Sequence, residues 1–100
     1  MATPESLTKK GVVNLLTHAN IYHFFPAANV YGRAGIPDII CCVNGHFLAI
    51  ECKAGKGRTT ALQDRELQRI RDSGGNALII YDRAEDFKLL GDVIYTLLNT

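Results

Sequence analysis

The sequence predicts a single α/β domain in which helices cover both faces of a β-sheet. Two apolar runs, 38–43 and 46–52, are joined by Asn44-Gly45, a pair that tolerates the positive φ angles of a two-residue hairpin turn. Both faces of this hairpin are apolar, which is typical of a sheet covered on both sides. Segments with apolar residues at helical spacing precede and follow the hairpin, and they can supply that cover.

The first predicted element is a helix over residues 4–19. Thr3 followed by Pro4 at the first helical position is typical of a helix start, and apolar residues then recur at spacings of three and four. A short aromatic and β-branched run at 21–25 ends before a proline, which predicts a strand. We expect residues 27–35 to form a loop that leads into the hairpin.

A glycine-rich basic loop over residues 54–58 follows the hairpin. Thr59 or Thr60 can cap the next helix, whose apolar residues form a narrow stripe. This helix is predicted to end at Gly74-Gly75.

The last part of the chain predicts a strand at 77–81 and a final helical stretch. Asp82 can cap that stretch, and Gly91 predicts a kink or break within it. The predicted element order is therefore αβββαβα, in one domain spanning residues 1–100.

Size and charge bound the function only loosely. A chain of 100 residues buries a comparatively small share of its surface, so association with a second copy would stabilise it. Lysine and arginine total 11 against 10 acidic residues, and the net charge of +1 does not by itself predict a nucleic-acid partner. Any surface that attracts phosphates must therefore be local.

Three cysteines, an odd number, lie within apolar runs, which predicts buried thiols rather than a disulfide framework. Their alternation along the strands and the lack of metal-ligand spacing argue against a zinc site. No apolar stretch approaches the roughly 20 residues of a membrane span, and the N-terminus does not resemble a signal peptide. We therefore expect a cytoplasmic protein with no membrane partner.

The hairpin register predicts where charged residues meet. If Asn44-Gly45 is a two-residue turn, counting outward along the ladder places Asp38 directly opposite Glu51. Opposed residues share a face with β-carbons about 5 Å apart, and Lys53 points to the same side. Three charged groups therefore converge at one end of the hairpin.

This convergence suits a metal site. Two carboxylates about 5 Å apart repel by about 3 kcal/mol at an effective dielectric constant near 20, so a cation between them is expected. Asp38, Glu51 and the backbone carbonyl of Cys52 could hold Mg²⁺ or Mn²⁺, while Lys53 orients a water that attacks a phosphodiester. The alternative is that Asp38 simply starts a strand and Glu51 forms an ordinary ion pair with Lys53.

The pattern of Gly35-Ile36-Pro37-Asp38, the twelve residues 39–50, and Glu51-Cys52-Lys53 resembles the signature of PD-(D/E)XK nucleases. The preceding glycine-flanked Arg33 and the later Gln63 make the chain similar to the VRR-NUC branch, whose stand-alone members occur in phages and prophages. The resemblance covers about residues 5–81.

The resemblance implies a restriction-endonuclease-like fold, an αβββαβ core with a mixed sheet flanked by helices, and cleavage of DNA that depends on Mg²⁺ or Mn²⁺. The catalytic residues it implies are Asp38, Glu51, Lys53 and Gln63. Glu5, in the first helix, would be a metal ligand or hold a water, although its flanks match the family loosely. A phage origin would place the protein in a bacterial host's cytoplasm.

Basic residues near this centre are candidates for phosphate contacts. Lys56 and Arg58 lie in the glycine-rich loop, and Arg33 precedes Asp38. The alternative for Arg33 is an ordinary loop cation. Further basic residues of the second helix could equally belong to a solvated face of mixed charge: Arg65, Arg69 and Arg71.

These expectations favour a structure-specific DNA endonuclease, in particular a resolvase of four-way junctions that acts as a homodimer, with the aromatic segment 22–31 or the C-terminal segment 87–98 as interface. One alternative is a flap, nick or duplex nuclease of a phage replication or restriction system. Another is a non-catalytic DNA-binding module that retains the fold. The sequence does not decide the geometry of the DNA substrate.

Overall fold

The computed structural model describes residues 3–27 and 33–100, and these contain three helices and four strands. In chain order they are α1 (Pro4–His18), β1 (Tyr22–Phe24), β2 (Ile39–Val43), β3 (His46–Cys52), α2 (Ala61–Asp72), β4 (Asn76–Ile80) and α3 (Ala84–Leu98). The strands form one sheet in the order β1-β2-β3-β4, in which β4 is parallel to β3 and the other neighbours are antiparallel. The predicted element order and the mixed sheet are both confirmed.

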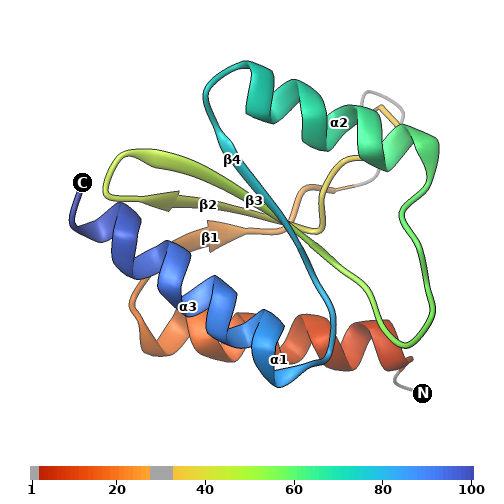
Figure 1. The fold of residues 1–100 in the computed structure, drawn as a ribbon, viewed down its shortest axis with the longest axis horizontal. Helices are drawn as coiled ribbons and strands as arrows, with labels where there is room; N and C mark the ends of the chain where they lie inside the picture. The colour runs from red at the N-terminus through yellow and green to blue at the C-terminus, as the bar shows by residue number, and fades with distance from the viewer. Residues whose placement is uncertain (1–2, 28–32) are drawn as a thin grey trace.

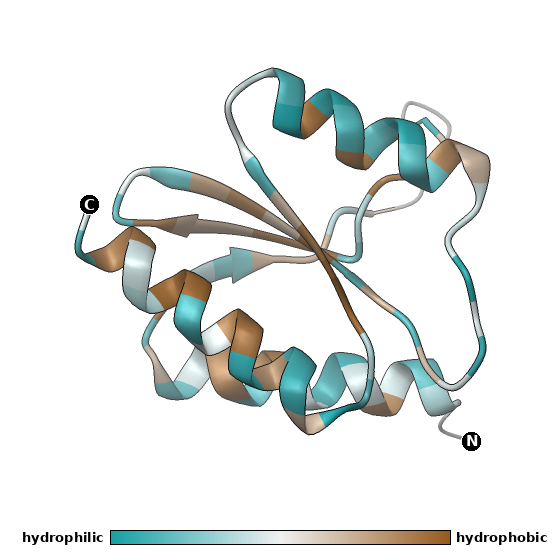
Figure 2. Ribbon diagram, in the orientation of Figure 1, coloured by the Kyte–Doolittle hydropathy of each residue, from teal (hydrophilic) through white to brown (hydrophobic). Residues whose placement is uncertain are grey.

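The sheet is the middle layer of three. Helices α1 and α3 cover one face, and α2 lies over the other (Figure 1). The larger core cluster fills the space beneath α1 and α3, and it includes Val12, Leu16, Ile39, Leu48, Ile50, Leu90 and Ile94. A smaller cluster of Ala49, Leu67 and Ala77 lies beneath α2. Figure 2 shows that strands β2, β3 and β4 are mostly hydrophobic, whereas β1 is partly hydrophilic. Helix α2 is mostly hydrophilic, as expected for a helix held by a narrow apolar stripe.

The β2–β3 turn has the predicted geometry. Asn44 and Gly45 both have positive φ, 52° and 83°, and Val43 pairs with His46. The ladder continues to Ile39 opposite Ile50. One step further along the same register stand Asp38 and Glu51.

Burial of the second face of the hairpin is less complete than the sequence predicted. Helix α2 packs on β4 and leaves the β1–β2 side of that face uncovered, so Phe47 is 45% exposed. Cys41 and Cys52 are buried as predicted, but Cys42 is exposed, and its predicted burial was wrong. The apolar run alone could not indicate that one helix covers only half a face.

Two expectations about the last helix were also wrong. Its N-cap residue is Arg83 rather than Asp82, and no side chain caps it; the Asp86 carboxylate instead accepts a hydrogen bond from the backbone N–H of Tyr81. Gly91 does not break α3, which continues through it to Leu98. A helical glycine costs about 1 kcal/mol relative to alanine, and burial of Leu90 and the apolar residues that follow it on the same helix face outweighs that cost. Among the described helices, none is long and apolar enough to cross a membrane.

Candidate active site

Three carboxylates meet where β2 begins and β3 ends. One oxygen each of Glu5, Asp38 and Glu51 lies within 4.8 Å of the other two. Glu5 comes from the first turn of α1, Asp38 immediately precedes β2, and Glu51 lies within β3. The hairpin register accounts for the approach of Asp38 to Glu51, and the packing of α1 against β3 adds Glu5.

Glu51 lies in the most enclosed part of the cluster. Its side chain is buried, and its Oε2 atom has no hydrogen-bond partner among the described residues. Burial, followed by the hydrogen bond with Asp38 and the Asp38 charge, raises the pKa of Glu51 to about 8, although the charge of Lys53 lowers it. Burying a carboxylate oxygen without a hydrogen-bond donor or a cation is energetically costly. A cation or a proton donor is therefore expected beside this atom.

Asp38 is held across the hairpin. Its Oδ2 atom accepts a hydrogen bond of 2.8 Å from the backbone N–H of Cys52. The bond ties the strand start to the opposite strand end and keeps the carboxylate beside Glu51. Pro37, which is buried, restricts the backbone immediately before it.

Lys53 is also buried, at 7% exposure, just beyond the end of β3. Its backbone N–H donates to the carbonyl of Ile80, and its Nζ atom lies 3.6 Å from Oε1 of Glu5. Within the part of the chain that the structure describes, Lys53 therefore pairs with Glu5 and not with Glu51. The simple Glu51–Lys53 ion pair considered from the sequence is not found.

The cluster fits a hard divalent cation. Such ions take carboxylate oxygens, and Asp38, Glu51 and Glu5 offer three within reach of one point. The unpartnered Oε2 atom of Glu51 is the kind of group that a cation would satisfy. The carbonyl of Cys52 belongs to the same strand end and stays a predicted ligand.

Gln63 has a clear local role at the start of α2. Its side-chain Oε1 atom accepts a hydrogen bond from the Thr60 backbone N–H, and its backbone N–H donates one to the Thr60 hydroxyl. This reciprocal pair is a capping box. The backbone of this turn also touches the loop before Asp38, because a β-carbon on Gly35 would lie 2.5 Å from the carbonyl of Leu62. Gly35 has a φ of +85°, so both its conformation and its surroundings require glycine. A catalytic role for Gln63 stays a prediction.

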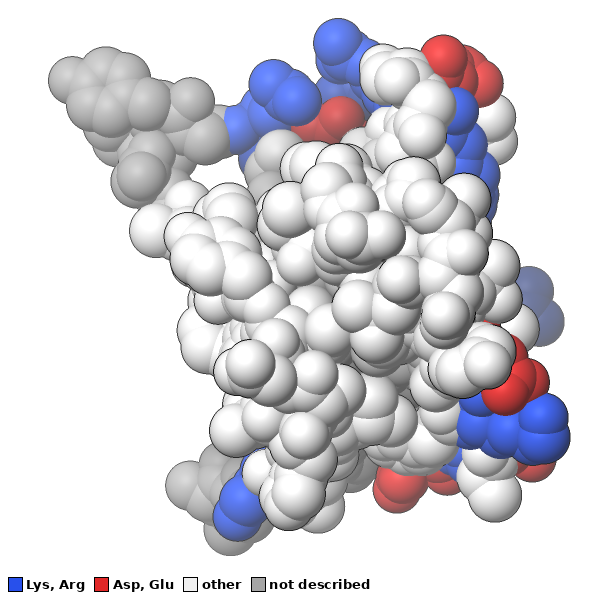
Figure 3. All heavy atoms as spheres, turned by 90° about the vertical axis from the view of Figure 1, so that its left-hand side faces the viewer, with Lys and Arg blue, Asp and Glu red and all other residues white. Residues whose placement is uncertain are grey.

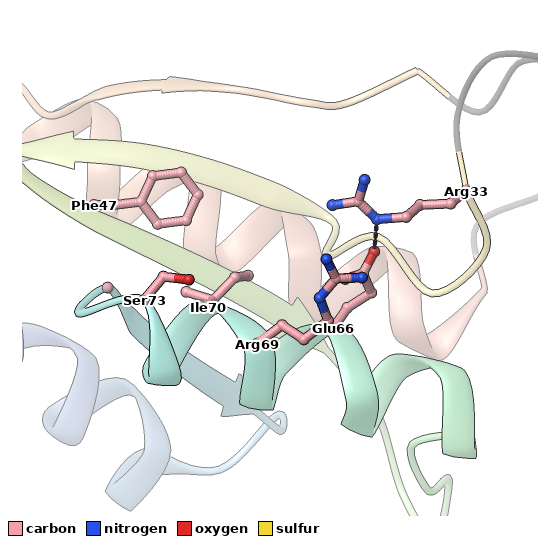
Figure 4. A pocket seen from close by; sticks show the side chains of 7 residues that line it. Arg33, Phe47, Glu66, Arg69, Ile70 and Ser73 are labelled. Atoms are coloured by element: carbon pink, nitrogen blue, oxygen red, sulfur yellow. Dashed lines mark hydrogen bonds and ion pairs between the residues drawn. The ribbon is translucent and has the colours of Figure 1, made fainter.

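Arg33 is engaged by a buried acid. Its Nε atom pairs with Oε1 of Glu66 on α2, and Glu66 is only 2% exposed. A solvated face of mixed charge, one alternative for this helix, therefore does not include Glu66. The pair borders a hollow of about 340 Å³ that Phe47 and Arg69 also line (Figure 4). In this view the terminal nitrogens of Arg33 point away from Glu66, and the Arg33 side chain is 62% exposed.

Lys9 is a site residue that the sequence interpretation missed. It lines a hollow of about 250 Å³ together with Arg33 and Asp38. It follows Glu5 by one helical turn, a spacing that places both on one helix face. That spacing was a usable signal once Glu5 had been assigned to the centre, whereas nothing in the sequence indicated the burial of Glu66. Lys56 and Arg58, both exposed, lie in the loop that follows Lys53.

Comparison with known proteins decides the fold. Neither the models of known protein families nor the sequences of curated proteins match this chain. Among solved structures, Hjc from Archaeoglobus fulgidus, a Holliday junction resolvase of an archaeal hyperthermophile, matches with a TM-score of 0.58 and 22% sequence identity, over 79% of this chain and 70% of that one. The chain has the restriction-endonuclease-like fold.

The restriction-endonuclease-like fold is the one that the sequence predicted. Membership of the PD-(D/E)XK superfamily stays a prediction. The finer assignment to the VRR-NUC branch, with its phage origin, stays a prediction. In this fold the carboxylate cluster occupies one end of the hairpin, where Asp38, Glu51 and Lys53 meet.

Proposed function

We propose that the protein is a metal-dependent DNA endonuclease whose centre consists of Glu5, Asp38, Glu51 and Lys53. The observation that carries the proposal is the buried Oε2 atom of Glu51, which has no partner among the described residues and lies in a cluster of three carboxylates beside a buried lysine. A purely structural site would be expected to pair that oxygen with a donor. The superfamily resemblance and the fold point to the same chemistry.

Asp38 and Glu51 would hold Mg²⁺ or Mn²⁺, with the Cys52 carbonyl and Glu5 as further ligands, Glu5 either directly or through a water. When bound, the cation polarises the phosphate and lowers the pKa of a water. Lys53 is buried and held by Glu5, so its ammonium stays fixed where it can orient the attacking water and stabilise developing charge. The hydrogen bond from Cys52 keeps Asp38 in place throughout.

Basic residues on either side of the centre would bind the DNA backbone. Lys9 and Arg33 border the hollow next to Asp38, and Lys56 and Arg58 follow Lys53. Phosphate contacts of this kind position a duplex or branched strand without reading its sequence. Gln63, at the start of α2, would be a further catalytic residue, as the resemblance to the VRR-NUC branch implies.

We propose branched DNA, in particular a four-way junction, as the substrate, and a homodimer as the active form. Figure 3 shows the side of the molecule at the left of Figure 1, a face with few charged residues over most of its area. Tyr22, Phe24 and Phe47, all at least 45% exposed, border one apolar hollow with the exposed Cys42. Burying this surface against a second copy would stabilise both and create two centres related by a two-fold axis.

The substrate is tested with a panel of labelled four-way junctions, flaps, nicked duplexes and plain duplexes, incubated with Mg²⁺ or Mn²⁺ and, in parallel, with EDTA. We expect paired cuts in the junction, slower cutting of duplex and no cutting in EDTA. Faster cutting of duplex or of a flap than of the junction would contradict the substrate. Sedimentation tests the dimer: Tyr22→Glu should yield monomers, while Leu7→Glu, an exposed position on α1, should not.

A further inference from the structure

A basic hollow lies between the loop that follows Lys53 and the segment that follows β4. Its volume is about 340 Å³, and it is lined by Gly55, Lys56, Gly57, Arg58, Tyr81 and Arg83. Three of these residues are cations and none is acidic. Lys56 and Arg58 come from the basic loop, whereas Tyr81 and Arg83 come from a segment more than twenty residues further along the chain. The fold therefore adds a third cation that sequence proximity does not reveal.

The two walls of the hollow are tied together. The backbone N–H of Gly57 donates to the carbonyl of Ala54 at 3.0 Å, which closes the loop on itself. The Tyr81 hydroxyl donates to the carbonyl of Gly57 at 2.7 Å. The backbone N–H of Lys53 donates to the carbonyl of Ile80, so the loop is attached to the end of β4 at both of its ends. The hollow is therefore shaped before any ligand arrives.

Arg83 is directed into this arrangement. Its guanidinium carbon lies 4.5 Å from the centre of the Tyr81 ring, within range of a cation–π interaction. Arg83 is the N-cap residue of α3, yet its side chain makes no capping hydrogen bond. In the described portion of the chain, neither Arg83 nor Lys56 nor Arg58 forms an ion pair. Three cations without counter-ions repel one another, and a bound anion would relieve that repulsion.

We propose that this hollow binds a phosphate of the DNA backbone next to the phosphate that is cleaved, with Arg83 as a binding residue and Tyr81 as the residue that positions Arg83 and the loop. The proposal rests on the proposed nuclease function, because the loop that lines the hollow follows Lys53 directly in the chain. Arginine matches the geometry of phosphate oxygens with two parallel N–H donors. A backbone phosphate carries no sequence information, so this contact should strengthen every DNA ligand equally.

The test compares Arg83→Ser with the wild type and with Lys88→Ala, which removes the same charge from an exposed pair elsewhere on α3. Dissociation constants for a labelled junction and a duplex are measured in EDTA at several salt concentrations. Loss of one charge-assisted contact should weaken both complexes about tenfold and reduce the slope of log affinity against log salt by about 0.9. Lys88→Ala should change neither quantity.

The same variant separates binding from folding. Serine is a favoured N-cap residue, and the backbone of Arg83 is already extended as an N-cap requires. Arg83→Ser should therefore unfold at the same or a higher temperature while it binds DNA less well. Tyr81→Phe retains the ring but loses the bond to Gly57, and we expect a smaller loss, about threefold.

Equal affinities for Arg83→Ser and Lys88→Ala would overturn the proposal. Normal cleavage by the wild type would in that case leave the nuclease function intact. Conversely, a wild type that never cleaves DNA, but whose binding still depends on Arg83, would overturn the nuclease function and leave the phosphate site. Inorganic phosphate is then added as a competitor of DNA binding. If the hollow binds phosphate through Arg83, phosphate should displace DNA less readily from Arg83→Ser than from the wild type. Equal displacement from the two proteins would also contradict the site.

Discussion

The backbone N–H of Cys52 donates a hydrogen bond of 2.8 Å to the Asp38 carboxylate across the β2–β3 hairpin. This bond holds an acid at the start of one strand against the end of the next, where Glu51 is buried. Two carboxylates kept this close repel each other unless a proton or a cation lies between them. The fold thus maintains an arrangement that is unfavourable when empty, which is common where a site is organised for its ligand.

Divalent metal should stabilise the protein. Mg²⁺ or Mn²⁺ that binds the folded state but not the unfolded chain raises the free energy of unfolding by about 2.7 kcal/mol at a concentration of 100 times the dissociation constant. The unfolding temperature rises with it. Thermal unfolding followed by circular dichroism measures this shift. Asp38→Asn should abolish it, and Asp64→Asn, on an exposed part of α2, should retain it. An equal shift in Asp38→Asn would indicate a metal site elsewhere.

The stability of the metal-free protein should fall as pH rises from about 4.5 to about 8. The pKa of Glu51 is raised from 4.5 to about 8 in the folded state, so within this window the folded protein retains a proton that the unfolded chain has lost. The free energy of unfolding therefore decreases with pH, by up to about 1.4 kcal/mol per unit. Urea unfolding in EDTA at pH 5 and pH 8 measures this, and Glu51→Gln should flatten the dependence. A wild type that gained stability over this range would contradict the assignment.

Glu66 should depend on Arg33. Arg33→Ala leaves the buried Glu66 carboxylate without its partner, and we expect the free energy of unfolding to fall by about 1–3 kcal/mol. Solvent around the largely exposed Arg33 keeps the loss from being larger. Adding Glu66→Gln removes the unpaired charge and should restore part of the stability. Urea unfolding of the single and double variants provides the comparison. Strictly additive effects of the two substitutions would show that the pair is not coupled.

Two glycines should respond in opposite ways to alanine. Gly91 lies inside α3 with open space around its added β-carbon, so Gly91→Ala should stabilise by about 0.5–1 kcal/mol. Gly35 has a positive φ and would clash with the backbone of Leu62, so Gly35→Ala should destabilise and displace the loop before Asp38. Unfolding temperatures of both variants test this. A destabilised Gly91→Ala would mean that α3 is interrupted there after all.

The parts of the site that could be predicted are those fixed by local geometry. Asn44-Gly45 determines a two-residue turn, and the turn determines that Asp38 stands opposite Glu51. By contrast, the approach of Lys9, the burial of Glu66 and the position of Arg83 depend on how helices pack against the sheet. No period or turn residue encodes those distances.

Errors in the sequence interpretation have the same origin. Asp82 fits the composition of a helix cap, but Asp86 forms the hydrogen bond with Tyr81 and the helix begins after Arg83. Cys42 lies in a run as apolar as its neighbours, and only the placement of α2 over β4 leaves it exposed. Local propensity is in each case a weaker determinant than packing between elements.

Single-turnover cleavage of a labelled four-way junction in Mg²⁺ tests the central claim most directly. The rates of Asp38→Asn, Glu51→Gln and Lys53→Ala are compared with that of Lys10→Ala, an exposed lysine on α1 outside the cluster, alongside their affinities for DNA in EDTA. We predict that each of the first three loses at least about 10²-fold in rate with unchanged fold and near-normal affinity, while Lys10→Ala cleaves like the wild type. Near wild-type rates for all three variants would contradict the assignment of the centre.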